Sequence, residues 1–302
     1  MPLAHGGAQV RFPWNAGQGS GSTLILGVGG VGGSGSGLEA DPYSSPNGGC
    51  LDLMLGKKVN TVRRLLREEG FPAVVSYGWL RWRARQSSVR LDNSSFGLSG
   101  IDGVSKTAML KNDYELPERA AIARYLRRDL PVVELGGSIG VVACVTNKLL
   151  KDRKAHLVVE ANPLAIPHLE QNRRRNRCQF EIVNRAIAYG AETVTFRPSS
   201  NMCGNSITGE GDQPPVTVPT TQLGDLVRHR GFERFTLVCD IEGLECDLVS
   251  NEADVLRNAD TIIMETHARL IGVPQTSSMM TRLQELGFRV IEETGFVVVL
   301  QK

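Results

Sequence analysis

The sequence lacks both a charge excess and a long apolar run, and each absence excludes a class of protein. Among its 302 residues, 34 Lys and Arg stand against 32 Asp and Glu, which leaves a formal net charge of +2. A dedicated nucleic-acid-binding protein usually carries a larger positive excess. The longest apolar stretches, 23–31 and 296–300, are shorter than the roughly 20 residues that a membrane-spanning helix requires. We therefore expect neither a nucleic-acid partner nor a membrane partner.

Paired cysteines are absent as well. None of the six cysteines forms a C-x-x-C motif, so neither a zinc site nor a disulfide framework is indicated. The first residues do not combine a basic segment, an apolar stretch and a small-residue cleavage site, so we expect a cytoplasmic protein. With 41% hydrophobic and 22% charged residues, the chain has the composition of a globular protein.

Residues 1–50 differ from the rest, because 14 of the 33 glycines lie there. Ordering such a stretch costs much backbone entropy, and few large side chains can offset it, so we expect a flexible extension. The segment 27–32 reads G-x-G-x-x-G, the dinucleotide-binding pattern. That pattern requires a helix directly after it, whereas Gly-Ser repeats and then Pro42 and Pro46 follow. We interpret the segment as low complexity.

The remainder divides into an accessory, substrate-facing segment over 51–112 and a regular domain over 113–302. In the first we expect a helix over 59–69, strands over 73–85 and 88–91, and turns over 93–103. A helix should run from 114 to about 128. Strands and helices then alternate, with a loop reaching residue 219 and two close strands at the end. We expect strands over 130–135, 156–160, 180–188, 193–197, 235–240, 261–265, 289–292 and 296–300, and helices over 139–150, 164–176, 223–229, 244–256 and 277–286.

This alternation predicts the fold class. Strands separated by helices form a parallel sheet covered on both faces. The last two strands are too close for a crossover helix and must form an antiparallel hairpin. We therefore expect an α/β doubly wound sheet that is mostly parallel and ends in one antiparallel strand.

The first strand of this alternation leads into a glycine turn that opens a helix. Glu134 lies on the strand, and Gly136, Gly137 and Gly140 follow. In doubly wound sheets, ligands bind at the carboxyl ends of the strands, and glycines let the backbone approach them closely. A dinucleotide loop would carry a glycine where Leu135 stands, so an NAD-dependent dehydrogenase is disfavoured.

Two further polar residues end the next strands. Glu160 lies 20 residues after Gly140 and could accept hydrogen bonds from both hydroxyl groups of a ribose, a feature of NAD and S-adenosylmethionine sites alike. A solvated carboxylate at a strand end is the alternative. Asn184 could meet an adenine edge or could cap a turn.

Several motifs together resemble the FkbM family of S-adenosylmethionine-dependent methyltransferases over about 110–302. Glu134–Gly140 reads ELGGSIG, Glu160 opens EANP, 218–226 reads VPTTQLGDL, 239–245 reads CDIEGLE and 264–267 reads METH. Tyr114 and Glu115 match a Tyr-Glu element found before the first motif of such enzymes. The chain departs from the family pattern at Leu223-Gly-Asp225 and at Cys239.

The resemblance implies a class I methyltransferase fold, which is Rossmann-like, with S-adenosyl-L-methionine as cofactor and methyl transfer to a hydroxyl group. It assigns the cofactor to Glu134, the turn glycines and Glu160. With the neighbouring candidates, the expected cofactor-binding residues are Tyr114, Glu115, Glu134, Gly136, Gly137, Ser138, Gly140, Glu160 and Asn184.

The acceptor chemistry is expected after the fourth and fifth strands. Asp240, Glu242 and Glu245 would raise one another's pKa and could provide a general base. Glu242 and Glu245 could instead stabilise the N-terminus of the next helix. Magnesium is conceivable among these oxygens, but the sequence does not demand a metal, and we predict none. His267 could be a base, a substrate contact or a structural residue.

The sequence therefore predicts O-methylation of a hydroxyl group on a small molecule, namely a sugar, glycan or secondary metabolite. The alternatives are an RNA methyltransferase and a non-catalytic module that binds the cofactor. The basic run 173–177 lies near a helix end, where a solvated face explains it. Neither the acceptor nor the oligomeric state can be read from the sequence.

Overall fold

The computed structural model describes residues 63–64, 66–68, 71, 75, 87–199 and 211–302. The chain divides into two units, Met1–Ser76 and Tyr77–Lys302. In the first, the described residues are helical, including Val75, for which the sequence predicted a strand. The expected extension over 1–50 and most of the elements expected over 59–69 and 73–85 lie outside the described residues.

The second unit contains a seven-stranded sheet. Its strand order is β11-β12-β10-β9-β3-β4-β5, and all neighbouring pairs are parallel except the two that involve β12. This order, with an antiparallel strand inserted by a terminal hairpin, defines the class I methyltransferase fold, so the predicted fold class is confirmed. The strands are β3 (Val132–Leu135), β4 (His156–Val159), β5 (Glu181–Val183), β9 (Phe235–Cys239), β10 (Ala259–Glu265), β11 (Arg289–Thr294) and β12 (Val297–Gln301).

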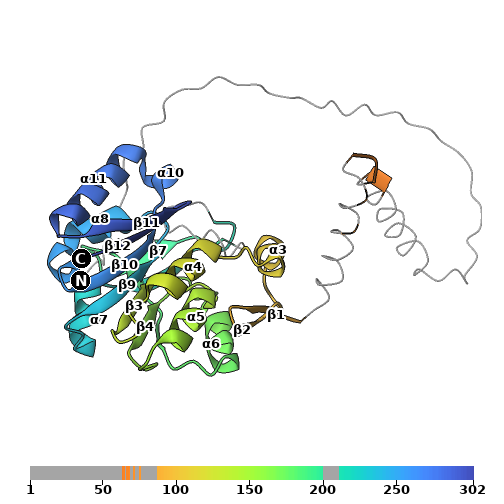
Figure 1. The fold of residues 1–302 in the computed structure, drawn as a ribbon, viewed down its shortest axis with the longest axis horizontal. Helices are drawn as coiled ribbons and strands as arrows, with labels where there is room; N and C mark the ends of the chain where they lie inside the picture. Colours follow the sequence, from red (N-terminus) through yellow and green to blue (C-terminus); the bar gives the residue numbers. More distant parts are fainter. Residues whose placement is uncertain (1–62, 65, 69–70, 72–74, 76–86, 200–210) are drawn as a thin grey trace, which may run out of the picture. The chain divides into compact units, whose positions relative to one another are not determined.

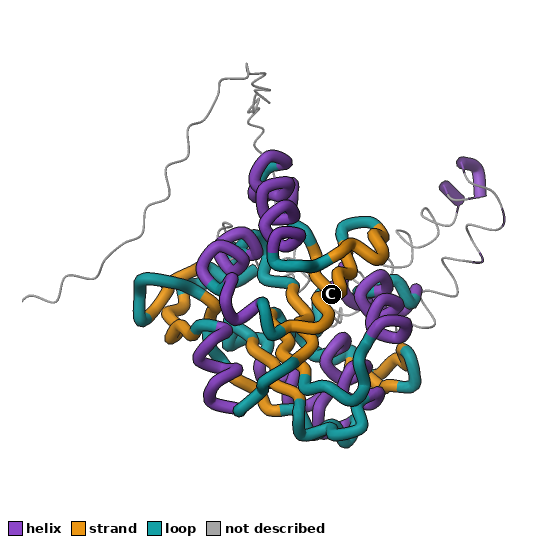
Figure 2. The backbone as a smooth tube through the Cα atoms, turned by 60° about the vertical axis from the view of Figure 1, so that its left-hand side comes forward, coloured by secondary structure: helices purple, strands orange, loops and turns teal. Residues whose placement is uncertain are grey.

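Helices cover both faces of the sheet (Figures 1 and 2). The two layers explain why β3, β4 and β9 are buried along their whole length, as continuous apolar strands of a parallel sheet are. One face packs against α4 (Leu116–Tyr125), α5 (Val141–Leu149) and α6 (Ile166–Arg175), and the other against α7 (Leu223–Arg230), α8 (Glu245–Asn251), α9 (Ala253–Leu256) and α11 (Val273–Glu285).

A hairpin and a helix precede the sheet. Strands β1 (Ser88–Leu91) and β2 (Ser94–Gly97) meet at Asp92 and Asn93, whose φ angles of 43° and 62° suit a tight hairpin turn. Helix α3 (Gly103–Lys111) follows, capped by Asp102. The sequence predicted only turns over 93–103, so β2 and α3 are corrections. These elements share an apolar core with α5 and α6, so residues 88–112 belong to the same unit as the sheet.

A second small sheet lies beside the main one. It consists of β6 (Ala186–Ile187), β8 (Val216–Thr221) and β7 (Thr193–Phe196), in that order. The single strand expected over 180–188 is therefore divided between two sheets. The loop expected to reach residue 219 ends earlier, because β8 begins at Val216. Pro219 is paired within this strand, although proline usually marks the end of strand pairing.

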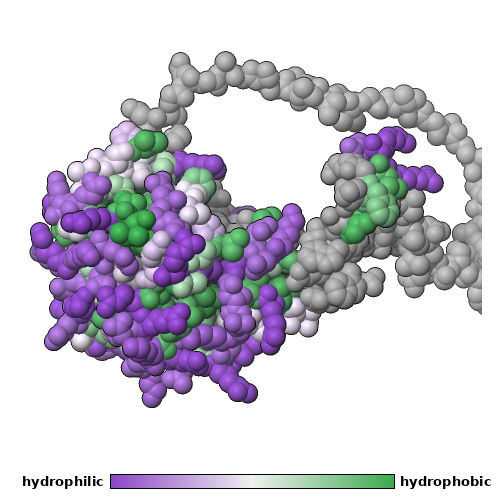
Figure 3. All heavy atoms as spheres, viewed as in Figure 1, coloured by the Kyte–Doolittle hydropathy of each residue, from purple (hydrophilic) through white to green (hydrophobic). Residues whose placement is uncertain are grey.

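The helices of the C-terminal half also differ from expectation. The helix predicted over 244–256 is interrupted at Glu252, whose carboxylate accepts hydrogen bonds from the Gly224 amide at 3.2 and 3.3 Å. A short helix, α10 (Ala268–Ile271), precedes α11, which begins at Val273 rather than at 277. None of the helices in the described ranges is long and apolar enough to cross a membrane. The face seen in Figure 3 is mostly hydrophilic, with hydrophobic residues in small separate patches.

Candidate active site

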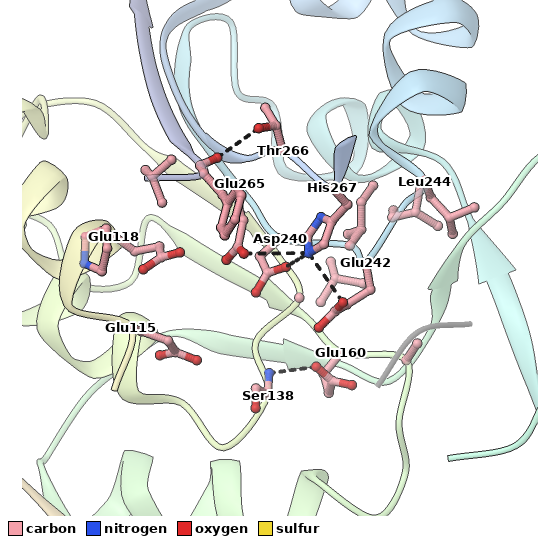
Figure 4. A pocket seen from close by; sticks show the side chains of 18 of the residues that line it. Glu115, Glu118, Ser138, Glu160, Asp240, Glu242, Leu244, Glu265, Thr266 and His267 are labelled. Carbon is pink, nitrogen blue, oxygen red and sulfur yellow. Dashed lines mark hydrogen bonds and ion pairs between the residues drawn. The ribbon is translucent and has the colours of Figure 1, made fainter. Parts of the chain in front are cut away.

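A cavity of about 520 Å³ opens at the carboxyl ends of β3, β4, β9 and β10. Its size is that of a typical site for a cofactor or small ligand. The position is the one at which doubly wound sheets bind ligands. Figure 4 shows acidic side chains directed into this space from several segments.

The glycine turn after β3 brings two strand ends into contact. Gly136 has a φ of +90°, and a Cβ atom there would lie 1.7 Å from the carbonyl oxygen of Asp240. The amide of Asp240 donates to the carbonyl of Leu135 at 2.9 Å. Only glycine allows this approach, which places Asp240 at the edge of the turn.

Glu160 closes the other side of the turn. Its Oε2 accepts a hydrogen bond from the Ser138 amide and its Oε1 one from the Asn162 amide, both at 2.6 Å. Burial raises the pKa of the Glu160 carboxyl group, and these amide hydrogen bonds oppose the shift. Each carboxylate oxygen keeps lone-pair capacity for a further donor. Glu160 can therefore receive a pair of hydroxyl groups from the cavity.

Three non-glycine residues that line the cavity have left-handed backbone conformations. The φ angles are 47° for Glu115, 43° for Ser138 and 51° for Glu242. Such conformations cost about 1 kcal/mol or more for residues with a Cβ atom, and they concentrate at functional sites. The backbone is therefore locally strained at three positions whose residues line the cavity.

Glu134 lies beneath the glycine turn rather than in the main cavity. Its Oε2 is 3.2 Å from Nε2 of the buried His156, while its Oε1 has no hydrogen-bond partner among the described residues. It lines a small cavity of about 10 Å³ together with Glu115 and Asp240. Burial raises the pKa of Glu134, and His156 opposes this shift.

His267 is the centre of a cluster of carboxylates (Figure 4). Its Nδ1 lies 2.8 Å from Glu245, and its Nε2 lies 3.3 Å from Glu242, 3.6 Å from Asp240 and 3.8 Å from Glu265. Burial disfavours the imidazolium, but the hydrogen bonds to Glu242 and Glu245 and the surrounding charges outweigh this effect and raise the pKa of His267 to about 11. His267 is therefore a cation at neutral pH.

Asp240 has the most exposed side chain among the acidic residues directly around the imidazole, at 32%, although its Oδ1 atom is buried. Its pKa lies well above the ordinary value, first because of desolvation and then because of the charges of Glu265 and Glu242; His267 opposes the shift. A carboxylate in this environment is a stronger base than an ordinary aspartate.

The same cluster is the place where a metal ion would be sought. One ligand atom each from Asp240, Glu242 and His267 lies within 4.8 Å of the others. The imidazolium already supplies positive charge there, and it would have to lose its proton before a cation could enter. Without a cation the arrangement is an ion-pair cluster, and the expectation that no metal is required stays a prediction.

The structure brings most of the predicted site residues together, though not all of them. Asn184 does not line the cavity; its amide donates to the carbonyls of Glu160 and Ala161 at 2.8 and 3.2 Å, the turn-capping alternative. Glu245 is fully buried behind His267, where it also accepts from the Gly243 amide. The predicted residues that line the main cavity are Tyr114, Glu115, Gly136, Ser138, Glu160, Asp240, Glu242 and His267. Glu134 and Gly137 line the small cavity, and Gly140 is the N-cap of α5.

Several lining residues were not among the predicted site residues. Glu118 lies three residues after Glu115, a spacing that places both on one face of a helix, and this was the available signal. Glu265 is the last residue of β10, at the same edge of the sheet as Asp240, which follows the neighbouring strand β9. Arg269 and Phe296 form the rim, with the guanidinium carbon 4.9 Å from the ring centroid. No local pattern marks these two residues.

No protein-family model and no curated protein matches the chain. Solved structures do match. The ribosomal protein L11 methylase of Lactobacillus delbrueckii subsp. bulgaricus is 13% identical with a TM-score of 0.37, over 63% of this chain and 77% of that one. The precorrin-6y C5,15-methyltransferase of Geobacter metallireducens GS-15 is 13% identical with a TM-score of 0.38, over 62% and 85%. Aeropyrum pernix fibrillarin, solved with S-adenosyl-L-methionine, is 12% identical with a TM-score of 0.38, over 62% and 74%.

Proposed function

We propose that the protein is an S-adenosylmethionine-dependent methyltransferase of the FkbM type that methylates a hydroxyl group. One observation carries the proposal: a single cavity joins Glu160, whose carboxylate can accept two further hydrogen bonds, to a carboxylate cluster in a class I methyltransferase fold. We refer to Gly136, Ser138 and Glu160 as the cofactor end of the cavity. Asp240, Glu242, Glu265 and His267 form its acceptor end.

The residues of the cofactor end fit S-adenosylmethionine. Glu160 would accept both ribose hydroxyl groups, since its two oxygens each use one lone pair on a backbone amide and keep another. Bound there, the cofactor would supply a methyl group on a positively charged sulfur, which departs as a neutral thioether. The acidic surroundings of Asp240 favour a positive charge at this place.

Asp240 is suited to be the general base. A neutral hydroxyl group is a poor nucleophile, so removal of its proton as the oxygen–methyl bond forms assists transfer. Asp240 takes that proton and releases it to solvent afterwards. His267 cannot take this role at neutral pH because it is already protonated; it holds the carboxylates in place. The acceptor must be positioned in line with the methyl group, which is the task of the cavity walls.

The charge of the cavity favours a neutral acceptor over RNA. Among the described residues, seven carboxyl groups but only three cationic side chains line it. A phosphate backbone would be repelled by such a surface, whereas hydroxyl groups donate hydrogen bonds to carboxylates. Phe296, with 47% of its surface exposed, adds an apolar face at the rim. A sugar, glycan or hydroxylated secondary metabolite meets these requirements.

Calorimetry with S-adenosylmethionine, S-adenosylhomocysteine and NAD tests the cofactor assignment. We expect both sulfur compounds to bind and NAD to give no heat; binding of NAD alone would overturn the proposal. Transfer of labelled methyl groups to a panel of glycans, hydroxylated metabolites and RNA then tests the acceptor class. Cofactor binding without transfer to any acceptor would favour a non-catalytic module, and transfer only to RNA would contradict the charge argument.

A further inference from the structure

A second pair of acidic groups lies in the acceptor wall, away from the imidazolium cluster. Glu118 is on the first turn of α4 and is only 6% exposed, and its carboxyl group faces that of Glu265 at the end of β10, where both residues line the cavity (Figure 4). The contact exists because α4 packs against β10. Figure 4 shows both carboxyl groups directed into the same space as that of Asp240.

The negative neighbours of this pair come from three elements. Glu115, at the start of α4, faces Glu118 and has a buried Oε2 with no hydrogen-bond partner among the described residues. Asp240 faces the pair from the end of β9 and Glu134 faces Glu115 from β3. The lining residues from the β11–β12 hairpin, Phe296 and Val297, are uncharged.

The cationic side chains near the pair make their shortest contacts with other groups. Arg119, next to Glu118 in the chain, forms an ion pair with Asp92 and donates to the carbonyl of Tyr114. His267 approaches Glu265 only at 3.8 Å, while it lies 2.8 Å from Glu245. Glu118 is buried and Glu265 is partly exposed, with 26% of its side chain accessible, and a buried carboxylate beside a second one remains ionised only at a cost. Burial, followed by the hydrogen bond to Glu265, raises the pKa of Glu118 to about 8.

We propose that Glu118 and Glu265 act as one acid pair, in which Glu118 donates a proton to Glu265 and so holds the free oxygen of Glu265 toward the acceptor. Glu118 is then a positioning residue that acts through Glu265. The proton also limits the negative charge beside Asp240, which leaves Asp240 able to work as a base near neutral pH. The inference rests on the proposed function for the role of the pair, whereas the shared proton can be measured without any ligand.

The deciding experiment is an infrared titration of the ligand-free protein. We expect a carboxylic-acid carbonyl band that disappears as the pH rises through about 8 and that is absent from Glu118→Gln, which keeps the shape and the donor. In Glu265→Gln the same transition should move to lower pH, because the partner's charge is gone. Glu170→Gln is the control, because Glu170 is exposed on α6, and in this variant the band should be unchanged. A wild-type protein without this transition, or a Glu118→Gln protein that keeps it, would overturn the proposal.

Calorimetry separates the pair from the proposed function. Because the positively charged cofactor favours an ionised pair, S-adenosylmethionine should bind a few-fold more tightly to the wild type at about pH 9 than at about pH 7. Its neutral thioether product should show no such change, and Glu118→Gln should lose the dependence. If S-adenosylmethionine does not bind at all, the proposed function fails while the infrared result still decides the pair. If it binds with no pH dependence, only the role of the pair is refuted.

Discussion

The cofactor end of the cavity is held by backbone hydrogen bonds, whereas the acceptor end is held by charge. At the cofactor end, backbone amides of the turn and of the strand end, among them those of Ser138 and Asn162, donate hydrogen bonds to Glu160. At the acceptor end, carboxylates from β9, β10 and α8 surround one imidazolium. The first arrangement is set by local chain geometry and should tolerate changes of pH. The second depends on protonation states and on the packing of distant segments.

The glycine turn is where the two ends meet, so its substitution should have the largest effect. In Gly136→Ala the new Cβ would meet the carbonyl of Asp240 at 1.7 Å in a backbone conformation that alanine rarely adopts. We expect a loss of about 3–5 kcal/mol in the free energy of unfolding, together with loss of cofactor binding. Urea denaturation and calorimetry measure both.

Gly231→Ala is the matched control, because Gly231 also has a positive φ, +64°, but no atom lies within 4 Å of its added Cβ. It should cost about 1 kcal/mol, the conformational part alone. Equal losses in the two variants would show that the close approach of the two strand ends is unimportant.

Asp240→Asn should separate catalysis from cofactor binding. Removal of the base should lower kcat about 10²–10⁴-fold, while the affinity for S-adenosylmethionine changes little. Steady-state kinetics with the acceptor identified in the panel and calorimetry of the free enzyme give the two numbers. A variant with unchanged kcat would remove Asp240 from the catalytic role.

Glu160→Gln should show the reverse pattern. The NH₂ group of the new glutamine would face either the Ser138 or the Asn162 amide. The site would also lose a charged acceptor for the ribose hydroxyl groups. We expect cofactor affinity to fall about 10–100-fold with a smaller change in kcat at saturating cofactor. Glu170→Gln should leave the affinity unaltered. A larger fall in kcat than in affinity would place Glu160 at the acceptor end instead.

The smallest effect concerns the pH dependence of stability. Because the pKa of His267 is raised to about 11 in the folded protein from 6.5, its contribution is complete below about pH 6.5 and is lost as the pH rises toward 11. A carboxyl group with a raised pKa also makes stability fall as the pH rises, but the contribution of Glu118 changes only up to about pH 8. His267→Gln should therefore flatten the decline above pH 8 by at most about 1.4 kcal/mol per pH unit.

Urea denaturation at several alkaline pH values measures this slope. His229→Gln is the control, since His229 is exposed on α7. If His267→Gln and wild type decline in parallel above pH 8, the imidazolium does not hold the acceptor end together.

The cofactor end could be predicted largely from the sequence, because its parts lie in two short contiguous motifs. A buried strand, a glycine turn and an acid at the end of the next strand imply their own geometry, since neighbouring parallel strands end at the same edge of the sheet. Asn184 shows the limit of this reasoning. Its place at a strand end was correct, but the direction of its amide, toward Glu160 O and Ala161 O, depends on the local turn.

The acceptor end could be predicted only in part. Asp240, Glu242 and His267 follow strands and were expected there, yet the sequence could not tell a histidine base from an imidazolium. That distinction depends on Glu242 and Glu245, which were both expected in the site but whose contacts with His267, at 3.3 and 2.8 Å, are set by the fold. Glu118 was missed because its contact with Glu265 requires α4 to pack on β10, and no local pattern specifies that packing.

By itself, the sequence determined the strand and helix alternation of the main sheet, the terminal hairpin and the motifs that end the strands, because these depend on hydrophobic periodicity and on backbone properties of nearby residues. Only the tertiary structure decided which carboxyl groups are buried beside one another and which surround His267, and thereby which protonation states are favoured. Those states depend on burial and on charges only a few ångströms apart, between groups that are up to about 150 residues apart in the chain.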